Sequence, residues 1–374
     1  MKTVIARERP FEFLKYKDGR PYSDDTVRNM YIARAFVLNL LKDVTISPDS
    51  DTHLHVMVDG DSPMMLSVVR QLSLSAHFIN FVEYDIFGKL ACKNRTLITL
   101  ASKKEPEAVV AELQKDEYLC NLLAQCRYTV FGKTANEGSF LDLEYEIVRD
   151  LPVACKDDII VKEEDVNSFV KASGSEDIFS IDTRKASMTS MVYELGTVID
   201  NLPGEDIHSA SRYILALDTF QYRLLGKKLR PLVNENKWSR NQLSVRNGLS
   251  NLCCSDCFDS RARGIMKYSQ DHGISELRAW ELNNAALTVS EHNRWVSEKL
   301  IMGFRMPGRE ERMAFETMSG RQKAAFAKLL KNNASDPAHL NMCSCLDLRR
   351  SDPGNLKYDA FLLLAIPIIL SKIS

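Results

Sequence analysis

The segment HLHVMVDGDSPMMLSVVRQLSL, residues 53–74, decides the fold of the first half of the chain. Residues 53–58 form a short apolar run that predicts a buried strand. Residues 59–63 (DGDSP) predict a turn, and a helix follows, because proline is tolerated at the first position of a helix. The segment therefore predicts a strand–turn–helix unit.

The same order repeats downstream. Residues 96–100 (TLITL) predict a second strand, residues 105–123 a second helix and residues 128–131 a third strand. Residues 140–148 predict a further strand. Strands that alternate with helices indicate a parallel sheet with right-handed crossovers. We therefore expect an α/β, Rossmann-like domain over residues 51–205.

Helical segments flank this domain. Residues 1–50 are expected to form an N-terminal helical segment, with Asp24 or Asp25 as its N-cap. Apolar residues of this segment recur at three- and four-residue steps: Met30, Ala33, Phe36, Val37 and Leu40. A short strand at 178–181 is the last expected strand, and residues 206–275 indicate a helical connector.

The turn after the first strand holds a degenerate phosphate loop. A dinucleotide-binding fold places three glycines there, for a tight turn, close approach of the pyrophosphate and helix packing. Here Gly60 is the only glycine, while Ser62 and Met65 occupy the second and third positions. Asp61 also places negative charge where a pyrophosphate would bind.

The second strand lacks the acidic residue that would bind a ribose, since it ends in LAS at residues 100–102. Gly60, Ser62 and Met64 remain the candidate cofactor-binding residues, for NAD or another nucleotide. The two departures favour a Rossmann-like scaffold that has lost its ligand over one that keeps it.

The segment EHNRW, residues 291–295, lies in a predicted helix with two different faces. Ser275 is its expected N-cap. One face holds an apolar stripe, with Asn293 in the same series: Leu282, Ala285, Ala286, Val289, Val296 and Leu300. The opposite face, at about 100° per residue, holds charged and aromatic residues: Glu291, Arg294, Trp295 and Glu298.

Two arrangements fit these residues. In the first they line a pocket, where Trp295 stacks on a ring and Arg294 and Arg305 pair with a carboxylate or phosphate. In the second, Glu291 and Arg294 form local structural pairs and Trp295 belongs to a second core. The candidate ligand-binding residues of the first arrangement are Glu291, His292, Asn293, Arg294, Trp295 and Arg305.

EHNRW and the following EKLIMGFR, residues 298–305, resemble the core helix of RyR (ryanodine receptor-type) repeat domains. Four downstream elements also match: HL at 339–340, LDL at 346–348, KYD at 357–359 and IPIIL at 366–370. Such repeats occur in ryanodine receptors and in bacterial and phage proteins. The resemblance covers residues 276–374 and implies a mainly helical, RyR-like C-terminal domain.

The rest of the chain is similar to bacterial and phage proteins that join a TrkA-N-like, NAD-binding Rossmann domain to a C-terminal RyR domain. Residues 58–78 fit the strand–loop–helix of that Rossmann domain, and Trp238, Arg246 and Ser250 fit a helical segment before the RyR domain. The resemblance implies sensing of a nucleotide, such as NAD, ADP-ribose, ATP or a cyclic nucleotide, by a unit that is not catalytic.

The composition is that of a globular protein, with 45% hydrophobic and 26% charged residues. A formal net charge of -1, from 49 basic and 50 acidic residues, argues against a nucleic-acid or anionic-membrane binder. Residues 1–13 contain no secretory signal, and the apolar run at 360–370, interrupted by Pro367, is shorter than the roughly 20 residues a bilayer requires. We expect a cytoplasmic protein without a membrane span.

Nine cysteines, an odd number, indicate free thiols in a reducing compartment. Cys254 and Cys257 have CxxC spacing next to Cys253, but Cys343 and Cys345 lack the paired spacing of a structural zinc site. We interpret both clusters as small buried residues and expect no metal.

The chain contains no GxSxG, Walker A, HExxH or EF-hand motif. We expect a non-catalytic sensor that binds a nucleotide or nucleotide-derived small molecule through the RyR domain or its junction with the Rossmann-like domain, as a signalling or defence effector or regulator. The alternatives are an interaction scaffold or regulatory subunit without a ligand, and an NAD-dependent enzyme. A homo-oligomer or a protein partner is also expected.

Overall fold

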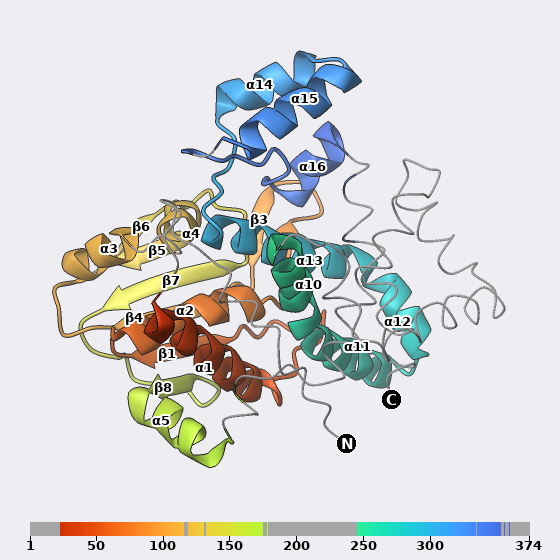
Figure 1. Cartoon of the computed structure of the whole chain (residues 1–374). Helices are drawn as coiled ribbons and strands as arrows, with labels where there is room; N and C mark the ends of the chain where they lie inside the picture. Colours follow the sequence, from red (N-terminus) through yellow and green to blue (C-terminus); the bar gives the residue numbers. More distant parts are fainter. Residues whose placement is uncertain are drawn as a thin grey trace.

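The computed structural model describes residues 23–115, 119–130, 132–174, 178, 245–333, 335–352, 355 and 359. Its N-terminal part is an α/β structure built on a mostly parallel six-stranded sheet, and its C-terminal part is helical (Figure 1). Within the described residues no helix combines the length and apolar character needed to span a bilayer, and the apolar run at 360–370 lies outside them.

The large sheet has the strand order β6-β5-β7-β4-β1-β8. Five of its strands are parallel: β1 (His55–Asp59), β4 (Thr96–Ala101), β5 (Arg127–Val130), β7 (Leu143–Val148) and β8 (Ile159–Lys162). The short β6 (Lys133–Ala135) runs antiparallel to β5 at one edge. The predicted parallel sheet is therefore confirmed, and four of its strands lie within a few residues of the predicted positions.

Some elements differ from those expected. Strands β6 and β8, and a separate hairpin of β2 (Val82–Tyr84) and β3 (Leu90–Lys93), were not predicted. Ile178 is helical rather than extended, so the strand predicted at 178–181 does not begin there, and residues 179–181 lie outside the described part of the chain.

Helices of the N-terminal part pack on the sheet and on each other (Figure 1). They are α1 (Asp24–Leu41), α2 (Pro63–Ser75), α3 (Pro106–Lys115), α4 (Cys120–Gln125) and α5 (Glu163–Ala172). Ser23, not Asp24 or Asp25, caps α1, because its hydroxyl accepts from the N–H of Thr26. The single helix predicted at 105–123 is two helices, α3 and α4.

The C-terminal part consists of seven described helices. They are α10 (Val245–Asp256), α11 (Phe258–His272), α12 (Glu276–Leu282), α13 (Asn284–Ile301), α14 (Arg309–Thr317), α15 (Gly320–Lys331) and α16 (Cys345–Ser351). Ser275 caps α12 as predicted, but the helix ends before Asn283 and a new helix, α13, carries EHNRW. Leu282, placed by the sequence on the packing stripe, is half exposed at this break.

Buried polar contacts join the two parts of the chain. Arg34 of α1 donates two hydrogen bonds to the carboxylate of Asp256 in α10, at 2.8 and 2.6 Å. Ser290 of α13 donates to the carbonyl of His77, just after α2, at 3.0 Å. Gly264 of α11 packs directly against the backbone of Ile46, so α11 lies close to the loop before β1.

Candidate functional site

Helix α13 brings five of the six predicted ligand-binding residues into the interior. The side chains of Glu291, His292, Asn293 and Arg294 are each at most 3% exposed, and Trp295 is half-buried. Helices α2, α4 and α10 all contact α13. Both faces of the helix are therefore covered, whereas the sequence pattern had placed its charged residues on a face opposite the core.

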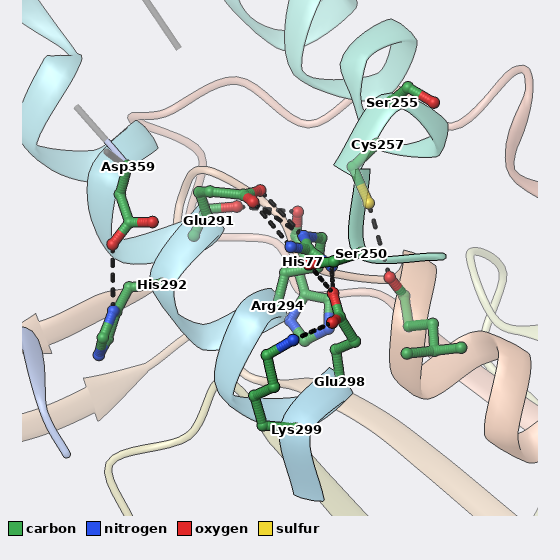
Figure 2. A network of polar contacts seen from close by, with 12 residues as sticks. His77, Ser250, Ser255, Cys257, Glu291, His292, Arg294, Glu298, Lys299 and Asp359 are labelled. Atoms are coloured by element: carbon green, nitrogen blue, oxygen red, sulfur yellow. Dashed lines mark hydrogen bonds and ion pairs between the residues drawn. The ribbon is translucent and has the colours of Figure 1, made fainter. Parts of the chain in front are cut away.

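A chain of charged groups runs along this helix (Figure 2). The Glu291 carboxylate accepts from Nη2 of Arg294 at 2.8 Å and from Nη1 of Arg261, in α11, at 2.7 Å. Arg294 also donates through Nη1 to Glu298 at 2.7 Å. Glu298 in turn accepts from Lys299 at 2.7 Å and from Ser250 of α10 at 2.9 Å.

This chain of ion pairs matches the second arrangement left open by the sequence, in which Glu291 and Arg294 form local pairs. Burial by itself would raise the pKa of Glu291, but the guanidinium groups of Arg294 and Arg261 outweigh it and lower the pKa to about 2. All three guanidinium nitrogens of Arg294 donate to carboxylates. A ligand would have to compete with these two carboxylates for the charge of a side chain that is only 1% exposed.

Asn293 differs from its neighbours. It is fully buried, and among the described residues neither its amide nitrogen nor its amide oxygen has a hydrogen-bond partner. Ser297, one turn later, is also fully buried, and its hydroxyl has no partner within the same described part of the chain.

His292 connects α13 to the segment before α16. Its Nε2 lies 2.8 Å from the carbonyl oxygen of Cys343 and its Nδ1 lies 3.2 Å from the carboxylate of Asp359 (Figure 2). Both ring nitrogens face oxygen atoms, an arrangement that a protonated ring with two N–H donors satisfies. The ring stacks on Trp295, which makes an edge contact with His339.

This histidine predicts a pH dependence of stability. Burial lowers the pKa of His292, but its bonds to Asp359 and Cys343 outweigh that effect, and the net shift is upward. Its contribution is complete below the unfolded pKa of about 6.5 and is lost as the pH rises through the folded pKa. We therefore expect the free energy of unfolding, measured by urea denaturation, to fall as the pH is raised from 6 to 9.

The control is the variant His292→Asn, which should show a flatter profile. Two nearby acids titrate in the same direction, since burial raises the pKa of Glu83 to about 7 and also raises the pKa of Asp359. Because His292 also lowers the pKa of both acids, the difference between the two profiles reports His292 together with its coupling to Glu83 and Asp359. Parallel profiles for the two proteins would contradict this assignment.

The remaining predicted ligand residue, Arg305, lies beyond the end of α13 and serves another contact. Its Nη1 and Nη2 donate to the two carboxylate oxygens of Glu311 at 2.7 and 2.8 Å, and its Nε donates to Asp336 at 2.7 Å. Arg305 and Arg294 are therefore each paired with their own carboxylates, so they do not form one anion-binding group.

The degenerate phosphate loop is held by its own side chains. Gly60 has a φ of 123°, a conformation that favours glycine. Ser62 caps α2 by accepting from the N–H of Met65, and the Asp61 carboxylate accepts from Ser102 at 2.9 Å and pairs with Lys104 at 2.9 Å. These contacts occupy the N-terminal end of α2 and the ammonium group of Lys104, the two groups that would otherwise face a phosphate.

The other candidate residues of this loop turn toward the protein. Met65 is fully buried in the hydrophobic core, where it fills the space beside Gly60, and Met64 is partly buried against the same core. Of the three candidate cofactor-binding residues, Ser62 is committed to the helix cap and Met64 to packing.

The cysteine clusters lie inside the helical region. Cys253, Cys254 and Cys257 are all buried, and burial raises the pKa of each thiol. Cys343 and Cys345 are also buried. Among the described residues, no group of three histidine, cysteine or acidic side chains lies close enough together to hold a metal ion.

A cavity of about 460 Å³ lies between α14, α15, α16 and the segment at 340–343. Figure 1 shows these three helices together at one end of the molecule, away from the sheet. The lining combines charged, amide, apolar and aromatic side chains: Arg312, Phe315, Glu316, Lys323, Leu340, Asn341, Cys343, Asp347, Arg350 and Ser351. Its volume lies within the range of about 300–1,000 Å³ of small-molecule sites, while its lining is more polar than is usual for them.

The chain matches no protein-family model, no curated protein and no solved structure. Its function is therefore inferred from its own residues.

One wall of the cavity is tied to the rest of the molecule. Cys343 lines the cavity, and its carbonyl is the one bound by His292 of α13. At the start of α16, the N–H of Cys345 donates to Glu83 at 3.1 Å and the hydroxyl of Tyr84 donates to Ser344 at 3.0 Å. The wall is thus held by both the EHNRW helix and strand β2.

None of the basic or aromatic lining residues was a candidate from the sequence alone. Arg312 and Phe315 come from α14, Lys323 from α15 and Arg350 from α16. A local signal existed only for Leu340 and Asp347, which belong to the elements that resemble RyR domains.

Proposed function

We propose that this chain is a non-catalytic ligand-sensing protein that binds a nucleotide or nucleotide-derived small molecule through its C-terminal helical region. We also propose that this region is an RyR-type domain and that the α/β part before it is Rossmann-like. The observation that supports ligand binding is the cavity between α14, α15 and α16, with its mixture of cationic, acidic and aromatic side chains.

The chemistry of the lining favours binding over catalysis. Burial raises the pKa of the Cys343 thiol to about 12, which keeps it protonated and weakly nucleophilic near neutral pH. In the phosphate loop, the helix end and Lys104 are already used by Ser62 and Asp61. These contacts favour the C-terminal cavity over the loop as the ligand site.

The contacts of α16 give a physical route from ligand to response. Asp347, Arg350 and Ser351 of α16 line the cavity, while the start of the same helix is bound by Glu83 and Tyr84 of β2. A ligand that shifts α16 must alter these contacts or those of His292. The sheet part would then respond to occupancy of the cavity.

Thermal unfolding of the purified chain with and without ligand tests this proposal. We expect one of NAD, ADP-ribose, ATP or a cyclic oligonucleotide to raise the unfolding temperature, since a ligand at a hundred times its Kd adds about 2.7 kcal/mol to the folded state. A flat response across the whole panel would count against ligand sensing.

A second candidate function is an interaction scaffold, expected as a homo-oligomer or with a protein partner. The observation that favours it is the tip of the β2–β3 hairpin, where Ile86 and Phe87 are 93% and 87% exposed. Exposed neighbouring apolar side chains of this kind often mark interaction surfaces. A stable assembly in solution that Phe87→Asp dissolves, combined with no ligand response, would favour the scaffold.

A further inference from the structure

We infer that the cavity between α14, α15 and α16 binds a nucleoside phosphate, with its anionic end at Arg312, Lys323 and Arg350 and its ring against Phe315. This inference rests on the proposed function and assigns a site and a ligand chemistry to it.

The cationic side chains of Arg312 and Lys323 are available to bind an anion, as their contacts show. Arg312 donates to the backbone carbonyls of Pro307 and Met342, both at 3.3 Å. The ammonium of Lys323 lies 4.9 Å from the centre of the Phe315 ring. Within the described part of the chain, neither residue forms an ion pair with a carboxylate.

Arg312 differs from Arg294 and Arg305 in the groups that its guanidinium contacts. Arg294 and Arg305, which the sequence had suggested as anion-binding residues, are each saturated by two carboxylates. Arg312 lies beside the cavity and, among the described residues, forms no ion pair with a carboxylate. A phosphate binds best where guanidinium and ammonium groups are free to donate charge-assisted hydrogen bonds.

The acidic side chains of the same lining favour a nucleoside phosphate over inorganic phosphate. Glu316 and Asp347 also line the cavity, so the lining carries three cationic and two anionic groups. Inorganic phosphate would leave both carboxylates without a partner. A nucleoside phosphate supplies ribose hydroxyls and, on many bases, an amino group, which can donate to these carboxylates and to Asn341 or Ser351.

The aromatic side of the cavity fits the base of a nucleotide. Phe315 and Leu340 give the cavity an apolar side, and Lys323 lies over the Phe315 ring. Because the Lys323 ammonium lies over this ring, a planar base stacks there when Lys323 moves aside to bind the phosphate, and base–aromatic stacking is typically worth about 1–3 kcal/mol. The two carboxylates disfavour highly charged polyphosphates, so we expect a monophosphate to bind more tightly than a triphosphate.

Isothermal titration calorimetry on the full chain tests the assignment with four probes: adenosine 5′-monophosphate, ATP, adenosine and inorganic phosphate. We expect the monophosphate to bind most tightly. The variants Arg312→Gln and Lys323→Gln should each weaken its binding roughly tenfold to a hundredfold, as expected for loss of a charged hydrogen bond. Phe315→Leu should weaken it by about tenfold through lost stacking.

The matched control is Lys328→Gln, which removes the same charge from an exposed position of α15 that does not line the cavity. It should leave the Kd of the monophosphate unchanged. Circular dichroism and the unfolding temperature without ligand check that each variant is folded, which is expected because Arg312 and Lys323 are both partly exposed.

The outcomes separate this inference from the proposed function. If the wild-type chain binds a nucleotide and Arg312→Gln and Lys323→Gln bind it equally well, the site assignment is wrong while ligand sensing stands. Adenosine or phosphate binding as tightly as the monophosphate would overturn the ligand class, as would tighter binding of ATP. If no nucleotide binds the wild-type chain, both the function and this inference fail.

Discussion

Replacing Glu291 with alanine is expected to lower the free energy of unfolding by about 3–5 kcal/mol, the usual cost of breaking a buried ion pair from one side. The variant leaves two guanidinium groups, those of Arg261 and Arg294, without the carboxylate that both now contact. Both arginines are only 1% exposed, so water cannot replace the lost partner. Urea denaturation of the variant and the wild-type chain measures the difference.

A surface ion pair gives the matched control. Glu281→Ala on α12 removes a carboxylate from an exposed pair with Arg278, which should cost less than about 1 kcal/mol. A loss at Glu291 no larger than the loss at Glu281 would show that the buried chain of charges does not hold α11 against α13. A double variant, Arg261→Met with Glu291→Met, should be less destabilised than Glu291→Ala, because it also removes one of the two guanidinium groups that lose the carboxylate, while Arg294 keeps its pair with Glu298.

Gly264→Ala is expected to destabilise the protein, against the usual trend within helices. Alanine normally stabilises an exposed helix interior by about 1 kcal/mol relative to glycine. At Gly264, however, a Cβ would overlap the carbonyl oxygen of Ile46 and lie 2.8 Å from Cδ1 of Ile79. Forcing α11 away from this loop should lower the free energy of unfolding by about 1–3 kcal/mol or more, measured by urea denaturation.

Gly320→Ala in α15 is the control for this substitution, because a Cβ there would have no atom within 4 Å. It should leave stability unchanged or raise it slightly. A neutral or stabilising effect at Gly264 would mean that α11 does not approach the Ile46 backbone so closely.

Four strands and α2 could be predicted because their signals are local. The apolar run before Gly60, the turn and Pro63 together specify β1 and α2, and similar runs specify β4, β5 and β7. Strand order is not local. β7 lies between β4 and β5, and β8 pairs with the far side of β1, and neither position leaves a trace in the sequence pattern.

The helix pattern left the surroundings of EHNRW open for a related reason. It placed the charged residues opposite the apolar stripe, and that face of α13 is covered by helices that supply partners, including Arg261 of α11. Periodicity records which residues are apolar and not which charges find a partner in the interior. The cavity was missed because Arg312, Lys323 and Arg350 are each ordinary polar residues of separate helices.

Helix α2 is buried on almost every side, between the sheet and helices α1, α10 and α13. Two of its partners, α10 and α13, come much later in the chain. The last strand of the sheet, β8, ends at residue 162, whereas α13 ends at residue 301. Synthesis of the intervening 139 residues (301 minus 162) takes about 7–28 s at the usual 5–20 residues per second. Throughout that time the faces of α2 that pack on α10 and α13 lack these two partners, while α1 and the sheet can already cover its other faces. A chain truncated after residue 205 would lack the α10 and α13 contacts permanently.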